Sequence, residues 1–457
     1  MDAVVTPEEM AAIDAAAPEP VEELIERAGA AVARLALQMM GGAYGRRVVV
    51  VAGKGNNGAD GRAAARRLEA RGVRCRVVDA ETAPDVLPPA DLVIDAAYGT
   101  GFRGRYDSPR PARDGTPVLA VDIPSGVDGV TGEASGHPLP ANRTITFGAW
   151  KPGLLLAAGA ELCGEVSVAD IGLDVSRARA HIVDGDAVDG WWPDRRTASH
   201  KWKAAVRIIA GSPGMTGAAH LAAAAAQRAG AGYVRLSTPG SSNDPFAPTE
   251  CVVTPLPLDG WATPELEGDL DRFHALAVGP GLGRNVETGQ QVRRFVNGAV
   301  LPLVIDGDGL VALEDRPAEV LADRPHGAAV VLTPHEGEFA ALTGGPPGAD
   351  RFAAARDLAV DTGAVVLLKG PTTLVAGPDG QVLAVTSGDP RLATAGTGDV
   401  LTGILAALLA QGVPAFEAAA SAAHLHGRAG VLACRHGLVA SDLIDHLPAA
   451  LTEVLGA

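Results

Sequence analysis

The sequence "VVVVAGKGNNGADG", residues 48–61, decides the fold of the first half of the chain. A run of valines enters a turn that carries Gly53, Gly55 and Gly58, and an alanine-rich stretch follows. A strand, a G-x-G-x-x-G turn and a helix in this order are typical of nucleotide-binding α/β folds, in which glycines let the backbone approach a pyrophosphate. Asp79, at the end of the next apolar run, would suit a dehydrogenase that holds the ribose of a nicotinamide cofactor.

The same turn also carries polar side chains that backbone binding of a phosphate does not need. Asn56, Asn57 and Asp60 lie among the glycines, and Asp95 and Ser125 end two further apolar runs. In a parallel sheet these oxygens converge on one crevice. Amide, carboxylate and hydroxyl oxygens suit a hard cation, and a single carboxylate suits a monovalent ion. The alternative is that the two asparagines are ordinary turn residues and Asp95 is a helix cap.

The chain has 457 residues, which is too long for one ordinary core and predicts two domains. In the first, helical spacing at 20–40 and 59–72 alternates with apolar runs at 46–52, 73–79, 91–99, 116–126 and 143–148. This alternation indicates a Rossmann-like, doubly wound parallel sheet. The charged stretch 184–203 contains Pro193 and lacks periodicity, so we place the boundary there, between domains at 1–190 and 200–457.

A second α/β series follows the boundary. We expect strands near 205–210, 233–237, 274–278, 302–305, 328–332 and 364–368, and helices near 217–230, 398–411 and 415–434.

Composition excludes several classes of protein. A net charge of −16 argues against a general nucleic-acid surface, and the longest apolar run, 401–410, is about half a membrane span. The four cysteines form no C-x-x-C motif, which favours reduced thiols in the cytosol. The acidic N-terminus lacks the pattern of a secretory signal. We therefore expect a soluble cytoplasmic protein with neither membrane nor nucleic-acid partners.

Four motifs of the first half together resemble the NAD(P)H-hydrate epimerases: "GNNGADG" (55–61), "DAAYGTGFRG" (95–104), "AVDIPSGVDG" (120–129) and "TFGAWKPG" (146–153). The resemblance implies potassium on Asn57, Asp95 and Ser125. It also implies substrate contacts at Asn56, Asn57, Gly58, Ala59, Asp60, Gly99, Thr100, Gly101, Phe102, Arg103, Gly104, Arg105 and Asp122. The family commonly has glycine where this chain has Ala59, and we expect the extra methyl group to tighten the turn.

The chemistry of such a substrate accounts for the polar turn. The hydrate carries a hydroxyl on C6, next to the ring nitrogen, and its loss gives an iminium that water attacks from either face. Asp122 is the candidate for moving the proton, because its carboxylate follows a buried strand at the crevice.

In the second half, "ATAGTGDVLTGILAALLAQG" (393–412) places Gly396, Gly398 and Asp399 at the start of a long apolar helix. Free N–H groups at a helix N-terminus bind anions. A carboxylate beside them can take a proton from a hydroxyl during phosphoryl transfer, so Asp399 is the candidate base. The alternative is that Asp399 only favours the helix dipole.

Further segments strengthen this interpretation: "LTPHEGEFAAL" (332–342), "VVLLKGPTTLVAG" (365–377), "AVGPGLG" (277–283) and a glycine-rich turn that begins at Ala210 and leads into the helix expected at 217–230. Lys369 and Gly370 end a strand and suit a nucleotide phosphate. Together the segments resemble the NAD(P)H-hydrate dehydratases, which have the ribokinase-like fold. The resemblance implies hydrate contacts at Ala218, Gly281, His335 and Asp399, and nucleotide contacts at Lys369, Gly370, Pro371, Thr372, Thr373 and Gly398.

The implied reaction is nucleotide-dependent dehydration, with ADP favoured over ATP and magnesium expected at the phosphates. We also expect a homo-oligomer, whose size the sequence does not define. One alternative is a ribokinase-like kinase that releases a phosphate ester of a small sugar or vitamin alcohol. Another is that the first domain is a non-catalytic binding module, as in some enhancers of mRNA decapping.

Overall fold

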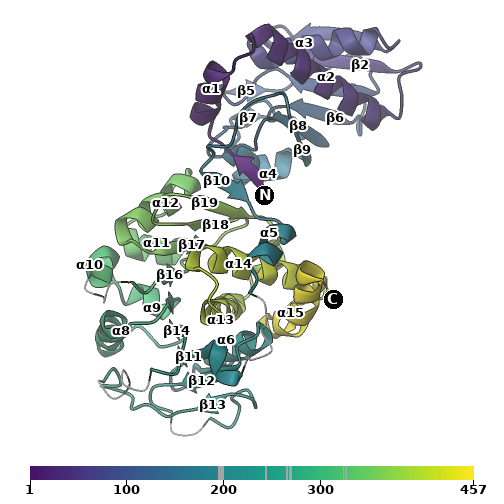
Figure 1. Cartoon of the computed structure of the whole chain (residues 1–457). Coiled ribbons are helices and arrows are strands. Elements are labelled where there is room, and N and C mark those ends of the chain that lie inside the picture. Colours follow the sequence, from purple (N-terminus) through teal and green to yellow (C-terminus); the bar gives the residue numbers. More distant parts are fainter. Residues whose placement is uncertain are drawn as a thin grey trace. The chain divides into compact units, whose positions relative to one another are not determined.

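The structure is a computed structural model, and it describes residues 1–193, 200–241, 244–263, 266, 270–322, 324 and 327–456. The chain divides into two compact units, Asp2–Ala180 and His181–Ala457 (Figure 1). The domain limits of 1–190 and 200–457 remain a proposal. Within the predicted linker, residues 194–199 lie outside the described residues. The stretch nevertheless contains the helix α5 (Gly185–Trp191), which the Asp184 side chain caps by accepting a hydrogen bond from the Ala187 N–H.

The N-terminal unit is built on a six-stranded parallel sheet of order β3-β2-β4-β6-β8-β9. Its strands are β2 (Arg47–Ala52), β3 (Arg74–Asp79), β4 (Leu92–Ala96), β6 (Val118–Val121), β8 (Arg143–Phe147) and β9 (Glu165–Ala169). The chain runs from β2 outward to β3 and then returns to β4 on the other side of β2. This reversal is the switch point at which doubly wound sheets bind ligands. The sheet therefore predicts a site beyond the carboxyl ends of β2 and β4.

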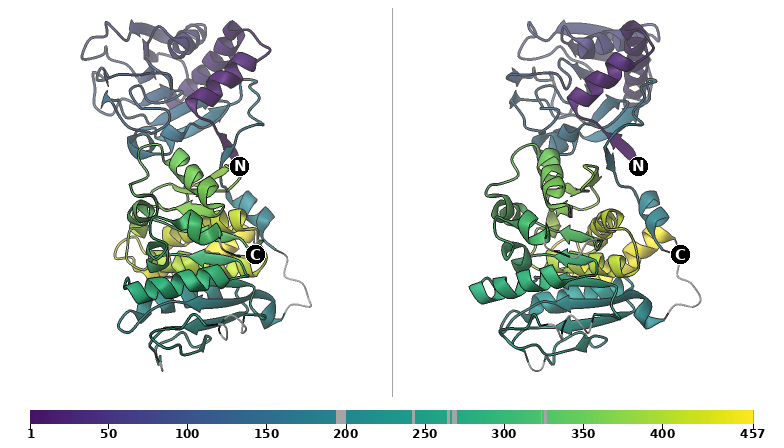
Figure 2. Two further views of the ribbon diagram at one scale, coloured as in Figure 1. Left: turned by 90° about the vertical axis from the view of Figure 1, so that its left-hand side faces the viewer. Right: turned by 60° about the vertical axis from the view of Figure 1, so that its left-hand side comes forward.

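Helices and short strands complete this unit. They are β1 (Asp2–Val4), α1 (Pro7–Ala16), α2 (Val21–Met40), α3 (Asn56–Glu69), β5 (Tyr106–Asp107), β7 (Gly136–His137), the 3-10 helix η1 (Pro152–Leu154) and α4 (Ala157–Leu162). The helices α2 and α3 lie side by side on one face of the sheet (Figure 2). Their apolar faces form one core cluster with Val48 and Val50 of β2, because α2 repeats apolar residues at helical spacing.

The C-terminal unit contains a long sheet of order β19-β18-β17-β16-β15-β14-β11-β12-β13, with β10 (Ala180–Ile182) beside β19. The strands are β11 (Ala205–Ile209), β12 (Tyr233–Ser237), β13 (Val252–Val253), β14 (Ala275–Val278), β15 (Leu303–Ile305), β16 (Val330–Leu332), β17 (Val365–Leu368), β18 (Thr373–Ala376) and β19 (Val382–Val385). Pairing is parallel from β13 to β17 and antiparallel among β17, β18 and β19. The sequence had predicted neither β18 nor β19.

Helices cover both faces of this sheet (Figure 1). One face carries α6 (Thr216–Arg228), α13 (Thr397–Ala410) and α14 (Ala415–Leu432), with α15 (Ala440–Leu455) packed behind them. The other carries α8 (Val286–Gly298), α9 (Asp308–Val311), α10 (Pro317–Ala322), α11 (Glu336–Thr343) and α12 (Arg351–Thr362). The short helices η2 (Lys201–Ala204) and η3 (Pro390–Leu392) lie in connections.

The helix α13 is apolar on all sides and buried along nearly its whole length, which is typical of a central helix. It packs closely on α6, because a Cβ atom at Gly403 would lie 2.1 Å from the Ala222 carbonyl oxygen. Only glycine permits this approach. The close contact holds the N-terminus of α13, with Asp399 in its first turn, in a defined position.

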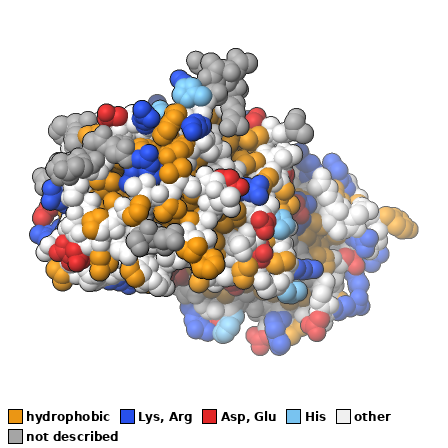
Figure 3. Space-filling view, turned by 90° about the horizontal axis from the view of Figure 1, so that it is seen from below, with side chains coloured by type: hydrophobic (Ala, Val, Ile, Leu, Met, Phe, Trp, Pro, Cys, Tyr) orange, Lys and Arg blue, Asp and Glu red, His pale blue; other side chains and the backbone are white. Residues whose placement is uncertain are grey.

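On the face shown in Figure 3, basic and acidic side chains are interspersed with apolar ones. Within the described residues, no helix has both the length and the apolarity needed to cross a membrane.

Candidate active sites

The N-terminal unit has a cavity of about 600 Å³ at the switch point of its sheet. It lies at the start of α3, beside the loop after β4 and the residue that follows β6. The cavity brings together most of the substrate residues that the resemblance implied. Those that line it are Asn56, Asn57, Asp60, Gly99, Thr100, Gly101, Phe102, Arg103 and Asp122. Gly58, Ala59, Gly104 and Arg105 do not line it.

The polar residues after β2 belong to a helix and not to a loop tip. We predicted a helix from residue 59, but α3 begins at Asn56, with Gly55 as its N-cap. Its first N–H groups have no partner within the helix, which makes this end suitable for an anion. Gly58 permits the tight entry, because a Cβ atom there would lie 1.9 Å from the Gly53 carbonyl oxygen. The expectation that Ala59 tightens a turn is therefore wrong, since Ala59 lies in the helix, where alanine is favoured.

Two of the predicted ion ligands lie in direct contact. The Ser125 hydroxyl donates to Asp95 Oδ1 at 2.7 Å, and the Ser125 N–H donates to Asp95 Oδ2 at 2.9 Å. Burial raises the pKa of Asp95, against the lowering effect of these hydrogen bonds. Both polar atoms of the Asn57 amide are buried without a hydrogen-bond partner. A buried amide oxygen without a partner and a buried carboxylate–hydroxyl pair are the kinds of ligand that fit a hard cation.

Asp122 forms a buried ion pair that the sequence reasoning missed. Lys151 Nζ lies 3.0 Å from Asp122 Oδ1 and donates to Thr146 Oγ1 at 2.7 Å. The Lys151 side chain is 2% exposed. Burial opposes ionisation of Asp122, but the Lys151 ammonium and hydrogen bonds from Thr100 and Thr146 outweigh it and lower its pKa. Asp122 also has a φ of 69°, an uncommon backbone conformation for a residue with a side chain. The site therefore holds Asp122 as a carboxylate.

The C-terminal unit has a cavity of about 760 Å³ between the start of α13 and the turn that joins β17 to β18. The predicted nucleotide and hydrate residues that line it are His335, Lys369, Gly370, Pro371, Thr373 and Gly398. Thr372 is buried beside it without lining it. Gly281 and Ala218 adjoin each other, because a Cβ atom at Gly281 would lie 3.1 Å from Ala218 Cβ. They come from the loop after β14 and the first turn of α6.

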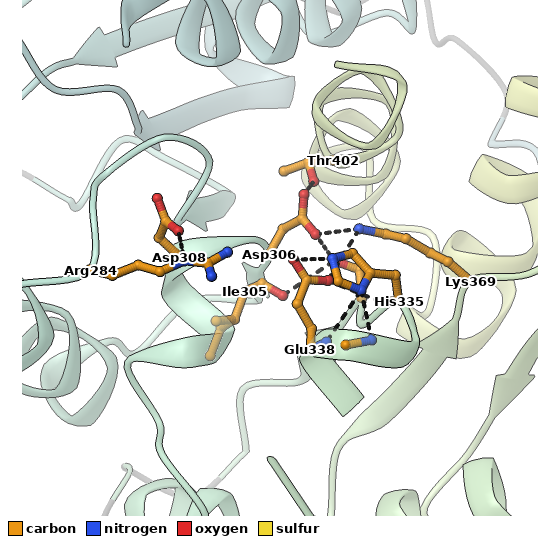
Figure 4. Close-up of polar contacts among 10 residues, drawn as sticks. Arg284, Ile305, Asp306, Asp308, His335, Glu338, Lys369 and Thr402 are labelled. Atoms are coloured by element: carbon orange, nitrogen blue, oxygen red, sulfur yellow. Dashed lines mark hydrogen bonds and ion pairs between the residues drawn. The ribbon is translucent and has the colours of Figure 1, made fainter. Parts of the chain in front are cut away.

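Lys369, which lines this cavity, belongs to a network of buried polar side chains (Figure 4). Lys369 Nζ is 2.6 Å from Asp306 Oδ1 and 3.9 Å from Glu338 Oε2. Asp306 is 2% exposed and also accepts hydrogen bonds from Thr333 Oγ1 at 2.7 Å and Thr402 Oγ1 at 2.6 Å. Burial alone would raise the pKa of Asp306. This effect is outweighed, mainly by the charge and hydrogen bond of Lys369, so the pKa is lowered. Sequence reasoning had chosen Lys369 but not Asp306, although Asp306 directly follows the apolar run of β15.

Asp399 lies close to this network. Burial, followed by the charge of Asp306, raises the pKa of Asp399 to about 7, while Lys369 opposes the rise. Lys369 Nζ is 3.3 Å from the position that a Cβ atom would take at Gly398. A carboxyl group that titrates near neutral pH at a helix N-terminus is suited to act as a general base.

His335 also has a structural role, which is the more common role of a lone histidine. It is the N-cap of α11, and its Nδ1 accepts hydrogen bonds from the N–H groups of Gly337 at 2.9 Å and Glu338 at 3.2 Å. The Glu338 side chain in turn accepts from the His335 N–H at 2.9 Å, which completes a capping box. A contact between His335 and the hydrate stays a prediction.

We expect His335→Ala to destabilise the C-terminal unit by about 0.5–2 kcal/mol, because an N-cap is lost. His335→Asn keeps a side-chain acceptor at the cap and should recover most of that stability. Urea unfolding of the two variants measures the difference. Equal stability of both variants and the parent would contradict the capping role.

These features define a two-unit α/β enzyme with one cavity at the switch point of a doubly wound sheet and another beside a helix-end carboxylate. A family model described as NAD(P)H-hydrate dehydratase matches residues 206–452. A second, described as YjeF-related protein N-terminus, matches residues 21–87 and 75–153. The chain belongs to the family of bifunctional NAD(P)H-hydrate repair enzymes, as its similarity to curated relatives shows.

Bifunctional NAD(P)H-hydrate repair enzyme Nnr of Moorella thermoacetica is 36% identical and aligns over 99% of this chain and 97% of its own. The protein of the same name from Mycobacterium tuberculosis is 38% identical over 83% of this chain and 82% of its own. Among solved structures, the ADP/ATP-dependent NAD(P)H-hydrate dehydratase from Bacillus subtilis, co-crystallised with ATP and Mg²⁺, is 31% identical. It covers 60% of this chain and 98% of its own, with a TM-score of 0.53. The doubly wound and ribokinase-like folds expected from the sequence are confirmed.

Proposed function

We propose that the protein repairs hydrated NADH and NADPH in two steps. The N-terminal unit interconverts the R and S hydrates, and the C-terminal unit dehydrates the S hydrate at the expense of ADP, releasing AMP and phosphate. The observation that carries the second step is the position and acidity of Asp399. This residue lies in the first turn of α13, beside a cavity of about 760 Å³. Burial raises the pKa of its carboxyl group to about 7. The names of the relatives support the same assignment.

In the C-terminal unit, Asp399 takes the proton of the C6 hydroxyl while the hydroxyl oxygen attacks the terminal phosphate of ADP. AMP leaves. The phosphorylated C6 oxygen then departs as phosphate while C5 loses a proton, which restores the C5=C6 double bond. The N–H groups at the start of α13 stabilise the transferring phosphoryl charge, and Lys369 lies beside them.

We propose potassium in the N-terminal unit, held by Asn57, Asp95 and Ser125. The unpartnered Asn57 amide and the buried contact between Asp95 and Ser125 support this set of ligands. A bound cation there would offset the buried carboxylate and fix the start of α3. Magnesium would come with the nucleotide phosphates. We assign it no protein ligand, because the described residues contain no cluster of three or more His, Cys, Asp or Glu side chains that could hold a metal ion.

We also propose a cytoplasmic homo-oligomer. The free cysteines Cys75, Cys163, Cys251 and Cys434 support a reducing compartment. Light scattering of the purified protein measures the number of subunits.

The deciding experiment incubates the protein with a mixture of R and S hydrates, ADP and magnesium, and follows the absorbance of reduced nicotinamide. We expect both hydrates to be consumed, with AMP and phosphate as co-products. A stable phosphorylated alcohol as the only product would instead show that the C-terminal unit is a kinase.

We expect Asn57→Ala to abolish the stimulation of R-to-S exchange by potassium, because the variant lacks the amide oxygen that would bind the ion. Dehydration of pure S hydrate by the same preparation is the internal control and should match that of the parent. Exchange rates measured against potassium concentration test this. Retained potassium dependence, or loss of both activities in a folded variant, would contradict the assignment.

A further inference from the structure

The N-terminal cavity contains a buried carboxyl group without a partner. Asp60 is 7% exposed and lines the cavity from the first turns of α3. No hydrogen bond or ion pair joins its side chain to any residue in the described part of the chain. Buried carboxyl groups are normally hydrogen-bonded, so an unpartnered one that faces a cavity is available to a ligand.

The charged groups around Asp60 place it and Asp122 in opposite protonation states. Burial, followed by the charges of Asp122 and Asp14, raises the pKa of Asp60 to about 8. Asp122 keeps a lowered pKa because Lys151 lies 3.0 Å away. The remaining cation of the cavity lining, Arg103, is exposed and turned to Asp128 at 3.7 Å. At neutral pH Asp60 is therefore mainly a carboxylic acid while Asp122 is a carboxylate, so the environments of these two carboxyl groups hold them in different protonation states.

We propose that Asp60, and not Asp122 as the sequence suggested, is the proton donor and acceptor of the R-to-S exchange, and that Asp122 is a fixed negative charge in the same cavity. This rests on the proposed function of the N-terminal unit. The acid form of Asp60 gives its proton to the C6 hydroxyl as the C6–O bond breaks, and water leaves. The lone pair of the ring nitrogen forms the iminium, whose positive charge the Asp122 carboxylate offsets. A second water then bonds to C6 on the opposite face and returns one proton to Asp60, so that atoms and charge balance.

The first test is Asp60→Asn, which keeps the size of the side chain but cannot supply a proton. We expect R-to-S exchange, corrected for the reaction without enzyme, to fall by about 10²–10⁴-fold. Dehydration of pure S hydrate by the same preparation should stay at the parent rate, which shows that the C-terminal unit is unaffected, and an unchanged urea unfolding curve shows that the N-terminal unit is folded. Asp60→Glu restores a proton donor at the end of a longer side chain and should recover part of the exchange.

The second test is the pH dependence of exchange by the parent. Only protonated Asp60 donates, so kcat/KM should fall as the pH rises through about 8, where the pKa of Asp60 lies. Asp14→Asn is the matched control, because it removes another carboxyl group from the same cavity. Asp14 helps to raise the pKa of Asp60, so this variant should retain exchange while its alkaline decline moves to lower pH.

Two results would overturn the proposal. One is a rate of exchange by Asp60→Asn within a few-fold of the parent rate. The other is an Asp60→Asn variant that exchanges slowly but whose kcat/KM still falls at alkaline pH as that of the parent does. If Asp60→Asn does not fold, the proposal is tested by the pH dependence of exchange by the parent and by the exchange rate of Asp60→Glu. A parent whose kcat/KM for exchange does not decline near pH 8 overturns the proposal. A parent that exchanges no hydrate at all would instead refute the proposed function of this unit.

Discussion

Asp399→Asn is expected to lower the turnover of dehydration by about 10²–10⁴-fold, because the amide cannot accept the proton of the hydroxyl. The substitution keeps the size of the side chain and the geometry at the start of α13. The N–H groups that would bind phosphate belong to the backbone and remain in place. ADP affinity, measured by calorimetry, should therefore stay close to that of the parent or become tighter, since a negative charge beside the nucleotide is removed.

The pH dependence of the parent gives an independent check on the same residue. A general base acts in its ionised form, and burial raises the pKa of Asp399 to about 7. Dehydration should therefore be slow at acidic pH and rise as the pH passes through about 7. R-to-S exchange in the N-terminal unit of Asp399→Asn is the internal control and should be undiminished. Dehydration by this variant at close to the parent rate would show that Asp399 is only a helix-start acid.

The sequence was most informative where a local pattern determines the structure. An apolar run, a glycine-containing turn and an alanine-rich stretch predicted β2 and α3, and the apolar stretch after Gly398 predicted α13. Asp95 and Ser125 end two apolar runs that become the neighbouring strand β4 and the loop after β6, so their convergence on one crevice was expected. The start of α3 was misplaced because asparagine and glycine favour turns as well as helix ends.

What the sequence could not show are the ion pairs formed between distant segments. Lys151 follows β8 and Asp122 follows β6, and nothing in either segment alone indicates that the two side chains pair. The same holds for Asp306 and Lys369, which are separated by 63 positions. These pairs decide which carboxyl groups are ionised. The division of roles between Asp60 and Asp122 therefore needed coordinates, although both residues had been selected.

The pair of Lys369 and Asp306 leads to the other large effect. Lys369→Met would leave Asp306 buried without its cation, and breaking a buried ion pair by removing one partner costs about 3–5 kcal/mol. The pKa of Asp306 is lowered in the folded protein, so its contribution to stability is present above its unfolded pKa and is lost as the pH falls through the folded value. Urea unfolding at neutral pH should show the full loss in the C-terminal unit. Lys203→Met, at an exposed lysine, is the matched control and should change stability by about 0.5 kcal/mol or less.

The same substitution tests how Lys369 acts on the base. Lys369 lowers the pKa of Asp399, so its removal should move the rise of dehydration with pH to higher values. A lysine that only binds nucleotide phosphate would raise the KM for ADP without moving that pH profile. One that only stabilises the fold would lower the free energy of unfolding and leave both kinetic readouts unchanged. We expect all three to change, because Lys369 Nζ lies 2.6 Å from Asp306 and 3.3 Å from the position of a Cβ atom at Gly398, at the start of the helix that carries Asp399. Unchanged unfolding together with an unmoved pH profile would show that the buried pair neither stabilises the unit nor tunes its base.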